Sequence, residues 1–286
     1  GAAHGGTLNN CIITGNSAYY AGGGATSCTL NNYTLTGNSA STGNFSYSYG
    51  GGAYYCTLNN CTVTGNGSGA SASTLKNCIV YFNSNTNYDS STLNYSCTTP
   101  LPTDGVGNIA NAPLFVDTNA WSNLRLQSNS PCINAGNNSY VTNATDLDGN
   151  PRIAGGTVDI GAYEFQAPAS MISYAWLQQF NLPINPATDT ADPDGDGVNN
   201  YREWLAGSDP TNPFSFPPLL TLIPYGANVI LTWPTNAVGF TLQSTTNLSS
   251  PALWSTNSPA PVVIGGQNVI INPIAGPQGY FRLITN

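Results

Sequence analysis

The sequence TLNNCIITGN at residues 7–16 recurs along the N-terminal third of the chain and decides the fold. It returns as TLNNYTLTGN at 29–38, as TLNNCTVTGN at 57–66 and as TLKNCIVYFN at 74–83, and a degenerate copy begins at Thr92. The copies start 22, 28, 17 and 18 residues apart, which is typical of solenoid repeats. One copy cannot bury an apolar face alone, so the copies are expected to stack on one another.

Apolar and polar residues alternate within each copy, as in a β-strand with one buried face. The apolar columns are Leu8, Leu30, Leu58, Leu75 and Leu93, and Ile13, Leu35, Val63 and Val80. Asparagines at the fourth and tenth positions can hydrogen-bond between copies stacked ~4.8 Å apart and tolerate left-handed corners. Residues 1 to about 100 are therefore predicted to form a right-handed parallel β-helix. A propeller or sandwich would not carry one motif at this spacing.

The seven cysteines fit the same stacking. Two pairs are expected to be bonded or in contact because they occupy equivalent positions on adjacent coils: Cys28 with Cys56, and Cys61 with Cys78. Cys97 and Cys132 remain as a possible third pair. Cys11 is left over. The alternative is that all seven are small buried apolar residues.

Charge is scarce in this chain. Its 286 residues include 5 Lys+Arg and 13 Asp+Glu, for a net charge of −8. Nucleic acid and anionic membranes are thereby excluded as expected partners, and no apolar run of ~18 residues predicts a membrane span. Cysteines in so lightly charged a chain favour an extracellular protein, secreted or attached to the cell surface. The first residue, Gly1, indicates either a removed signal peptide or a fragment.

The sharpest local motif is DPDGDGVNNYRE at residues 192–203, which matches the calcium loop D-x-D-x-D-G-x5-E. The predicted Ca²⁺ ligands are the side chains of Asp192, Asp194, Asp196, Asn200 and Glu203 and the carbonyl of Val198. Helical patterns flank the loop at 171–180 and at 200–206, the second ending at Gly207. An acidic turn without metal is the alternative, but its carboxylates would repel one another.

Charge returns in the segment between Pro100 and Gln166. Arg152 is predicted to pair with nearby carboxylates and so close the last coils. Those carboxylates are Asp146, Asp148, Asp159 and Glu164. A second cation site at Asp146, Asp148 and Asn150 is a further possibility.

Two motifs of this segment, DLDGNPR at 146–152 and VDIGAYE at 158–164, together with the preceding coils, resemble the bacterial β-helix proteins called choice-of-anchor Q proteins. The resemblance covers residues 1–166, taken as one domain, and implies secretion and surface display without established catalytic residues. Residues 167–217 resemble dockerin-like or thrombospondin type 3-like calcium modules. Only one loop is present where dockerins carry two, which favours a structural clamp over cohesin binding.

Short strands separated by turns continue from residue 218 to residue 286 and predict a small β-sandwich. Its Tyr-Phe-Arg-Leu end at 280–283 resembles the C-terminal β-domains of secreted bacterial proteins, which implies sorting or attachment. A plain packing domain is the alternative. The predicted fold is thus mainly β: a right-handed parallel β-helix, a small helix-loop-helix calcium module and a C-terminal β-sandwich.

No enzyme is expected, because residues 1–103 contain only Lys76, Asp89 and His4 as candidate acid–base groups. The favoured function is a structural or cell-surface protein that self-associates end to end into a fibre or matrix. The alternatives are a carbohydrate-binding adhesin, or a non-catalytic part of a β-helix polysaccharide-degrading enzyme. Tyrosines able to stack on sugars are Tyr19, Tyr20, Tyr47, Tyr49, Tyr54, Tyr55 and Tyr88.

Overall fold

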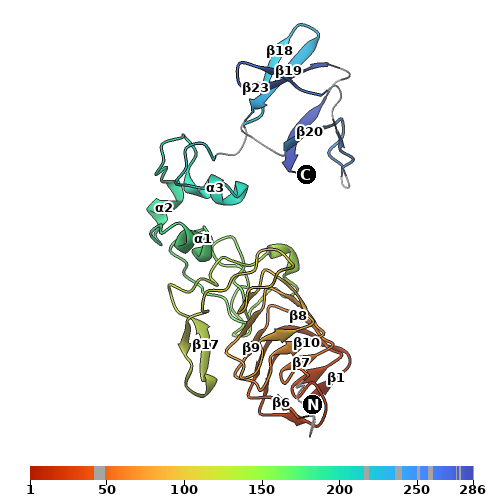
Figure 1. Cartoon of the computed structure of the whole chain (residues 1–286), viewed down its shortest axis with the longest axis vertical. Coiled ribbons are helices and arrows are strands. Elements are labelled where there is room, and N and C mark those ends of the chain that lie inside the picture. The colour runs from red at the N-terminus through yellow and green to blue at the C-terminus, as the bar shows by residue number, and fades with distance from the viewer. Residues whose placement is uncertain are drawn as a thin grey trace. The chain divides into compact units, whose positions relative to one another are not determined.

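The computed structural model describes residues 1–41, 49–215, 219–235, 240–249, 252–256, 260–274, 276 and 278–285. The chain is mainly β and forms two compact units, Gly1–Ala191 and Asp192–Asn286. The boundary between the units falls inside the segment 167–217 that the sequence marks as a module. Figure 1 shows the elements of each unit.

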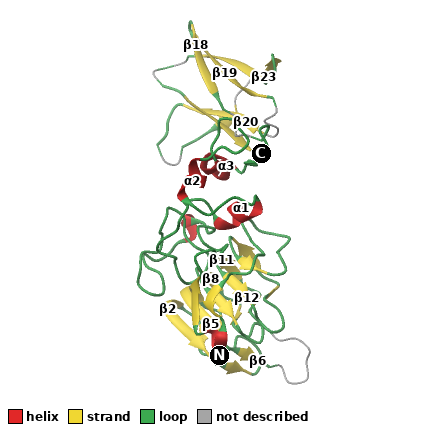
Figure 2. Ribbon diagram, turned by 90° about the vertical axis from the view of Figure 1, so that its left-hand side faces the viewer, coloured by secondary structure: helices red, strands yellow, loops and turns green. Residues whose placement is uncertain are grey.

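Copies of the repeat pair in register in parallel sheets. The largest sheet contains β2 (Thr7–Thr14), β5 (Thr29–Thr36), β8 (Thr57–Asn59), β9 (Thr62–Thr64), β11 (Thr74–Lys76), β12 (Ile79–Tyr81), β14 (Thr92–Asn94) and β15 (Cys97–Thr98). Leu8 pairs with Leu30, which pairs in turn with Leu58, and the column continues to Leu93. The predicted leucine column is confirmed, and its members from Leu30 onward are buried. The sheet curls like a solenoid (Figure 2).

Asparagine fills two structural positions in each of the first four copies. Asn10, Asn32, Asn60 and Asn77 have φ between 52° and 58°, so each occupies the predicted left-handed corner. The tenth-position residues form the predicted ladder: Asn38 donates through Nδ2 to Asn66 Oδ1 at 3.1 Å, and its own Oδ1 accepts from Asn16 Nδ2 at 3.1 Å. Asn38 is fully buried, so the ladder satisfies amides that would otherwise lie unpaired inside the sheet curl.

Two smaller parallel sheets complete the stacked coils. One contains β1 (Ala3–His4), β4 (Ala25–Thr26), β7 (Ala53–Tyr54), β10 (Ala70–Ser71) and β13 (Tyr88–Asp89), and the other contains β3 (Ser17–Ala18) and β6 (Ser39–Ala40). Buried glycines precede β4 and β7: Gly24 N–H donates to Gly51 O at 2.9 Å. A Cβ atom on Gly24 would lie 2.5 Å from Gly52 O, so only glycine allows the coils to approach this closely.

Each of the seven cysteines is a free thiol. The predicted pairs are in contact without being bonded. Cys28 N–H donates to Cys56 Sγ at 3.5 Å. Cys61 and Cys78 are both fully buried, and their thiols donate to the carbonyls of Leu30 and Leu58, each at 3.4 Å. Burial raises the pKa of Cys56 to about 11, so this thiol stays protonated and packs as a small apolar group.

The segment after the coils contains β16 (Phe115–Asp117) and β17 (Asn123–Leu126), which pair antiparallel, and the short 3-10 helices Asn119–Trp121 and Asn138–Tyr140. Helix α1 (Tyr174–Gln179) is shorter than the predicted 171–180 and docks through the N–H of Tyr174 on the carbonyl of Ile133 at 3.1 Å. Helix α2 (Pro186–Thr190) follows, with Asn185 as its N-cap; the sequence analysis did not anticipate it.

The second unit contains helix α3 (Asn200–Ala206) and two antiparallel sheets. The first sheet contains β18 (Thr221–Tyr225), β19 (Asn228–Pro234), β23 (Gln267–Pro273) and β22 (Val262–Ile264), and the second contains β21 (Ser255–Thr256), β20 (Phe240–Thr245) and β24 (Tyr280–Thr285). Both sheets contribute to one buried cluster. Its members are Leu231, Trp233, Leu242 and Ile270, with Phe281 and Leu283 packed against them.

Candidate metal centre

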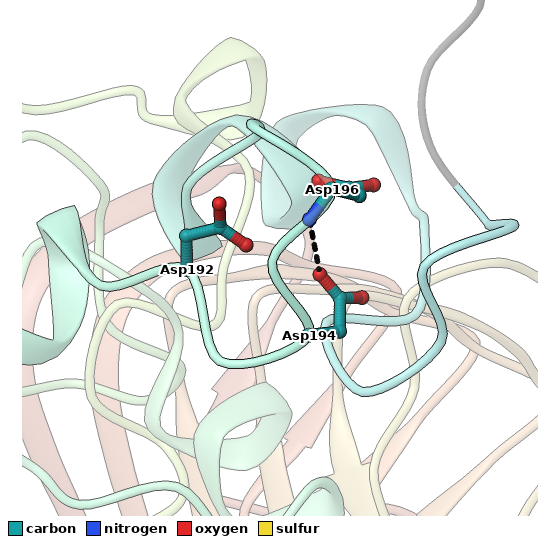
Figure 3. A group of neighbouring side chains, drawn as sticks. All are labelled: Asp192, Asp194 and Asp196. Carbon is teal, nitrogen blue, oxygen red and sulfur yellow. Dashed lines mark hydrogen bonds between the residues drawn. The ribbon is translucent and has the colours of Figure 1, made fainter.

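The loop that opens the second unit is folded by its own aspartates. Asp192 accepts the backbone N–H of Gly195 through Oδ1 at 2.8 Å and that of Gly197 through Oδ2 at 2.9 Å. Gly195 and Gly197 have φ of 77° and 91°, a backbone that glycine adopts without strain. The alternation of Asp and Gly therefore wraps the chain tightly around the aspartate side chains (Figure 3).

The three aspartates converge. One carboxylate oxygen from each of Asp192, Asp194 and Asp196 lies within 4.8 Å of the other two. Asp194 accepts the N–H of Asp196 at 3.3 Å, and Asp196 accepts the N–H of Val198 at 2.7 Å. The second oxygen of Asp194 and that of Asp196 are buried and have no hydrogen-bond partner. Buried anionic oxygens without donors are costly, so they mark a place where a cation fits.

Helix α3 places the fourth carboxylate. Asn199 caps the helix by accepting the N–H of Arg202 at 3.0 Å, and Gly207 ends it in the left-handed conformation, as predicted. Glu203 is fully buried; its Oε1 accepts the hydroxyl of Ser208 at 3.2 Å, whereas its Oε2 is buried without a partner. Ser208 is a residue that the sequence analysis missed, although its place directly after the helix-ending glycine is a usable signal.

The electrostatics of the loop show an excess of negative charge. Burial, followed by the charge of Asp194, raises the pKa of Glu203 to about 7. Burial also raises the pKa of Asp194, and the charge of Asp196 adds to it. The pKa of Asp192 is lowered instead, because the N–H groups of Gly197 and Gly195 stabilise its carboxylate. A divalent cation would remove this repulsion.

The donor set consists entirely of oxygen and suits a hard cation such as Ca²⁺. The three aspartates are gathered at one point, and Glu203 lies close enough for their charges to act on it. Asn200 is buried at the start of α3, and Val198 is half-buried in the loop. All six residues that the motif singles out therefore belong to one loop-and-helix element of twelve consecutive residues.

The second possible cation site, at Asp146, Asp148 and Asn150, is filled by protein donors. Asp146 accepts the backbone N–H groups of Asp148, Asn150 and Glu164 at 2.9–3.0 Å. Asp148 forms a bidentate salt bridge with Arg125, whose Nε and Nη2 donate to its two carboxylate oxygens. Both carboxylates are thus satisfied by protein donors, which argues against a cation at this place.

Arg152 is buried, as a residue that closes the coils requires, but its partners differ partly from those predicted. Its Nη2 lies 3.9 Å from Glu164 Oε2 and donates to the carbonyls of Asp159 and Gly161 at 3.0 and 2.7 Å. Asp148 pairs elsewhere. Burial raises the pKa of Glu164 to about 9 and that of Asp159 to about 7, although backbone N–H groups donate to both carboxylates. These contacts join Arg152 to residues 159–164 within the segment that follows the coils.

No protein-family model matches this chain, and no curated protein sequence matches it. Within the described ranges, no helix is both long enough and apolar enough to cross a membrane.

Proposed function

We propose that the protein is a secreted or cell-surface structural protein that is not an enzyme and that binds Ca²⁺ in its 192–203 loop. One observation carries the calcium assignment: buried oxygens of Asp194, Asp196 and Glu203 lack any donor in a loop where three aspartates already converge. Calcium would supply the missing positive charge. The remaining ligands would be Asp192, Asn200 and the carbonyl of Val198.

The scaffold of this proposal is a right-handed parallel β-helix over residues 1–166. It is followed by the calcium module over 167–217 and a C-terminal β-sandwich over 218–286. The in-register parallel pairing of the repeat copies supports the β-helix. The buried cluster shared by the two antiparallel sheets supports the sandwich. Such stacked coils provide a long, rigid body suited to a structural role.

The few charged groups of the coils support a non-enzymatic role. The Lys76 ammonium lies 4.9 Å from the ring centroid of Tyr140, in a cation–π contact. Asp89 accepts the hydroxyls of Ser71 and Ser90 at 3.4 and 3.2 Å. Both charged groups are therefore engaged in contacts with neighbouring side chains of the protein itself.

Terbium luminescence tests the calcium site, because Tb³⁺ replaces Ca²⁺ and is sensitised by nearby aromatic rings. Tyr201 and Trp204, whose ring centroids are 5.8 Å apart, lie on α3 beside the ligands. We expect sensitised Tb³⁺ emission. Added Ca²⁺ should displace Tb³⁺ and lower the emission, whereas Mg²⁺ should lower it only weakly, since Mg²⁺ demands a smaller octahedral site. Asp194→Ala should abolish the emission. Asp104→Asn, which removes the same charge from an exposed position, is the matched control.

A chain that binds neither Tb³⁺ nor Ca²⁺ at millimolar concentration would refute the assignment. A second readout is protease sensitivity, because metal binding stabilises only the folded loop. Removing Ca²⁺ with a chelator is expected to expose segment 167–217 to cleavage and to lower the melting temperature.

Carbohydrate binding is the second candidate, and exposed tyrosines on the coils favour it. The rings of Tyr49 and Tyr54 lie 5.7 Å apart and those of Tyr54 and Tyr55 lie 4.4 Å apart; Tyr55 is 61% exposed. Tyr19 and Tyr20 form another exposed pair. Such faces can stack on sugar rings. Tyr47, also considered from the sequence, lies outside the described residues.

A glycan array tests this candidate directly. Binding that Tyr55→Ala weakens, while Phe214→Ala leaves it unchanged, would support an adhesin. Phe214 is a suitable control because it is 78% exposed on the other unit. If the protein binds no glycan on the array, the carbohydrate-binding candidate is refuted and the structural role remains.

A further inference from the structure

The corner that follows the sheet of β1, β4, β7, β10 and β13 carries one large side chain. In each of the five coils this corner is a single residue with φ between 48° and 70°. Its backbone is held by the neighbouring coil, as where Tyr55 N–H donates to Ser71 O at 3.1 Å. Four of the corners use small residues: Gly5, Ser27, Ala72 and Ser90. The third coil uses Tyr55 at φ 52°, a backbone that is unfavourable for a bulky residue.

The ring of Tyr55 is not required by the corner itself, because the other coils form it without a ring. The residue is 61% exposed, so burial does not offset its strained backbone. Its ring contacts that of Tyr54 at 4.4 Å between centroids, and Tyr54 contacts Tyr49 at 5.7 Å. Tyr88, also considered from the sequence, packs instead against the buried core of the coils. A strained and exposed residue of this kind points to a function.

An exposed carboxylate lies on the same face as the ring cluster. Tyr54 pairs in register with Ser71, which pairs in turn with Asp89 (Figure 1 shows β7 and β10, the strands of Tyr54 and Ser71). Neighbouring strands lie ~4.8 Å apart, so Asp89 is two strands along the stack from Tyr54. Ser71 is buried, and its hydroxyl and that of Ser90 donate to Asp89 Oδ2 at 3.4 and 3.2 Å. Within the described ranges no donor contacts Oδ1 of Asp89, so this oxygen can accept a ligand hydroxyl.

Charge is nearly absent from this face. Residues 1–75 contain no Asp, Glu, Lys or Arg, so the five strands carry only Asp89 and His4 as candidate charged groups. Lys76 belongs to another sheet, where its ammonium lies over the ring of Tyr140. Acidic polymers need cations that the face lacks. A neutral glycan fits, because aromatic rings stack on the C–H faces of sugars and a carboxylate accepts their hydroxyls.

We propose that this face binds a neutral polysaccharide, with one sugar ring stacked on Tyr55 and a neighbouring sugar donating a hydroxyl to Asp89. The inference rests on the second candidate function, carbohydrate binding, and adds the site and the class of glycan. Tyr55 and Asp89 are separated along the stack by two strand spacings, roughly 10 Å, so the ligand must contain at least two linked sugars. Ser71 and Ser90 are positioning residues that hold the carboxylate.

Affinity electrophoresis of the full chain in native gels tests the class of glycan. The neutral probes are hydroxyethyl cellulose, galactomannan and dextran, and the acidic probe is polygalacturonate. We expect a neutral probe to retard the protein and polygalacturonate to leave its mobility unchanged, because the carboxylates of the acidic polymer would meet Asp89. Retardation should persist in chelator, since the face and the 192–203 loop lie in different compact units.

Tyr55→Ser tests the stacking platform and gives the third coil the residue that Ser27 supplies one coil earlier. Affinity for the neutral probe should fall at least tenfold, whereas the melting temperature should equal or exceed that of the wild type, because the strained aromatic residue is removed. The matched control is Tyr225→Ser, which removes a tyrosine that is 66% exposed on the other unit and should leave the affinity unchanged. A Tyr55→Ser protein that melts well below the wild type would show that the ring serves the fold, and would overturn the site.

Asp89→Asn tests the carboxylate. The variant should bind the neutral probe at least threefold more weakly, since a charge-assisted hydrogen bond is lost, and it should begin to bind polygalacturonate. Asp104→Asn, which removes the same charge from an exposed position, should do neither.

The ways in which this inference can fail are distinguishable. Glycan binding that Tyr55→Ser and Asp89→Asn leave unchanged would refute this site and leave carbohydrate binding itself intact. Binding of polygalacturonate in preference to every neutral probe would refute the class of glycan. A chain that binds terbium but no neutral glycan, in gels or on the array, would overturn the inference and leave the calcium site intact.

Discussion

Replacing Glu203 with glutamine should move the stability of the second unit in opposite directions with and without calcium. The pKa of Glu203 rises from 4.5 to about 7 in the metal-free fold, mainly because the carboxyl is buried. Because this pKa is raised on folding, the associated stability is present below pH ~4.5 and is lost as the pH rises through ~7. Above pH 7, the metal-free protein therefore carries an ionised, buried and partly unpaired carboxylate.

The magnitude follows from the pKa, since each pH unit corresponds to about 1.4 kcal/mol. The rise at Glu203 amounts to about 3 kcal/mol, and solvent screening together with changes at the Ser208 contact reduces the expected net effect to about 1–3 kcal/mol. For a domain of roughly 100 residues, about 1 kcal/mol shifts the melting temperature by about 4–8 °C. Glu203→Gln should therefore melt at least ~4 °C higher than the wild type in chelator at pH 8.

In saturating Ca²⁺ the order should reverse. The wild-type protein gains stability as RT ln(1 + [Ca²⁺]/Kd), whereas the variant lacks the bidentate carboxylate and gains little. Differential scanning calorimetry of the full chain, with and without Ca²⁺ at pH 8, measures both shifts. Asp104→Asn controls for the change in net charge. A Glu203→Gln protein that melts lower in chelator, yet still gains the full calcium shift, would refute the reasoning.

Other substitutions and conditions test the site and the scaffold. Calcium affinity should fall about tenfold for each pH unit below ~7, because a proton competes with the cation for Glu203. Displacement of terbium by Ca²⁺ at pH 5 to 8 would measure this, and an affinity that does not change over this range would contradict the raised pKa of Glu203. Asn38→Ala should cost about 1–3 kcal/mol in urea unfolding, because the buried amide of Asn66 and the half-buried amide of Asn16 lose their partner. Gly24→Ala should cost about 1–3 kcal/mol, since its methyl group would press on Gly52 O, and an unchanged midpoint would argue against the close approach of these coils. Arg152→Met should destabilise the segment after the coils by about 1–3 kcal/mol, because the carbonyls of Asp159 and Gly161 lose their buried donor, and an unchanged urea midpoint would contradict this role.

The sequence by itself determined the stacking register and the local fold of the aspartate-rich loop at residues 192–203. Strand pairing at a fixed register places like residues above like, so the repeated leucines, of which Leu30 is one, predict their column without knowledge of any distant contact. The loop is equally local: Asp192 to Glu203 are consecutive residues, and Asp-Gly alternation sets the turns that bring the aspartates together. Both features are therefore set by residues that are consecutive in the sequence or that occupy equivalent positions in neighbouring copies.

Only the tertiary structure decided which distant groups meet. Asp148 pairs with Arg125 rather than with Arg152, although Arg152 is nearer in the sequence. The cysteine pairs pack as buried thiols rather than as disulfides, and residues 105–111 lie across the last strands of the coils. These outcomes depend on how segments of unlike sequence dock on the repeats. A repeating pattern predicts contacts between its own copies, whereas the burial and pairing of non-repeating residues are set by long-range packing.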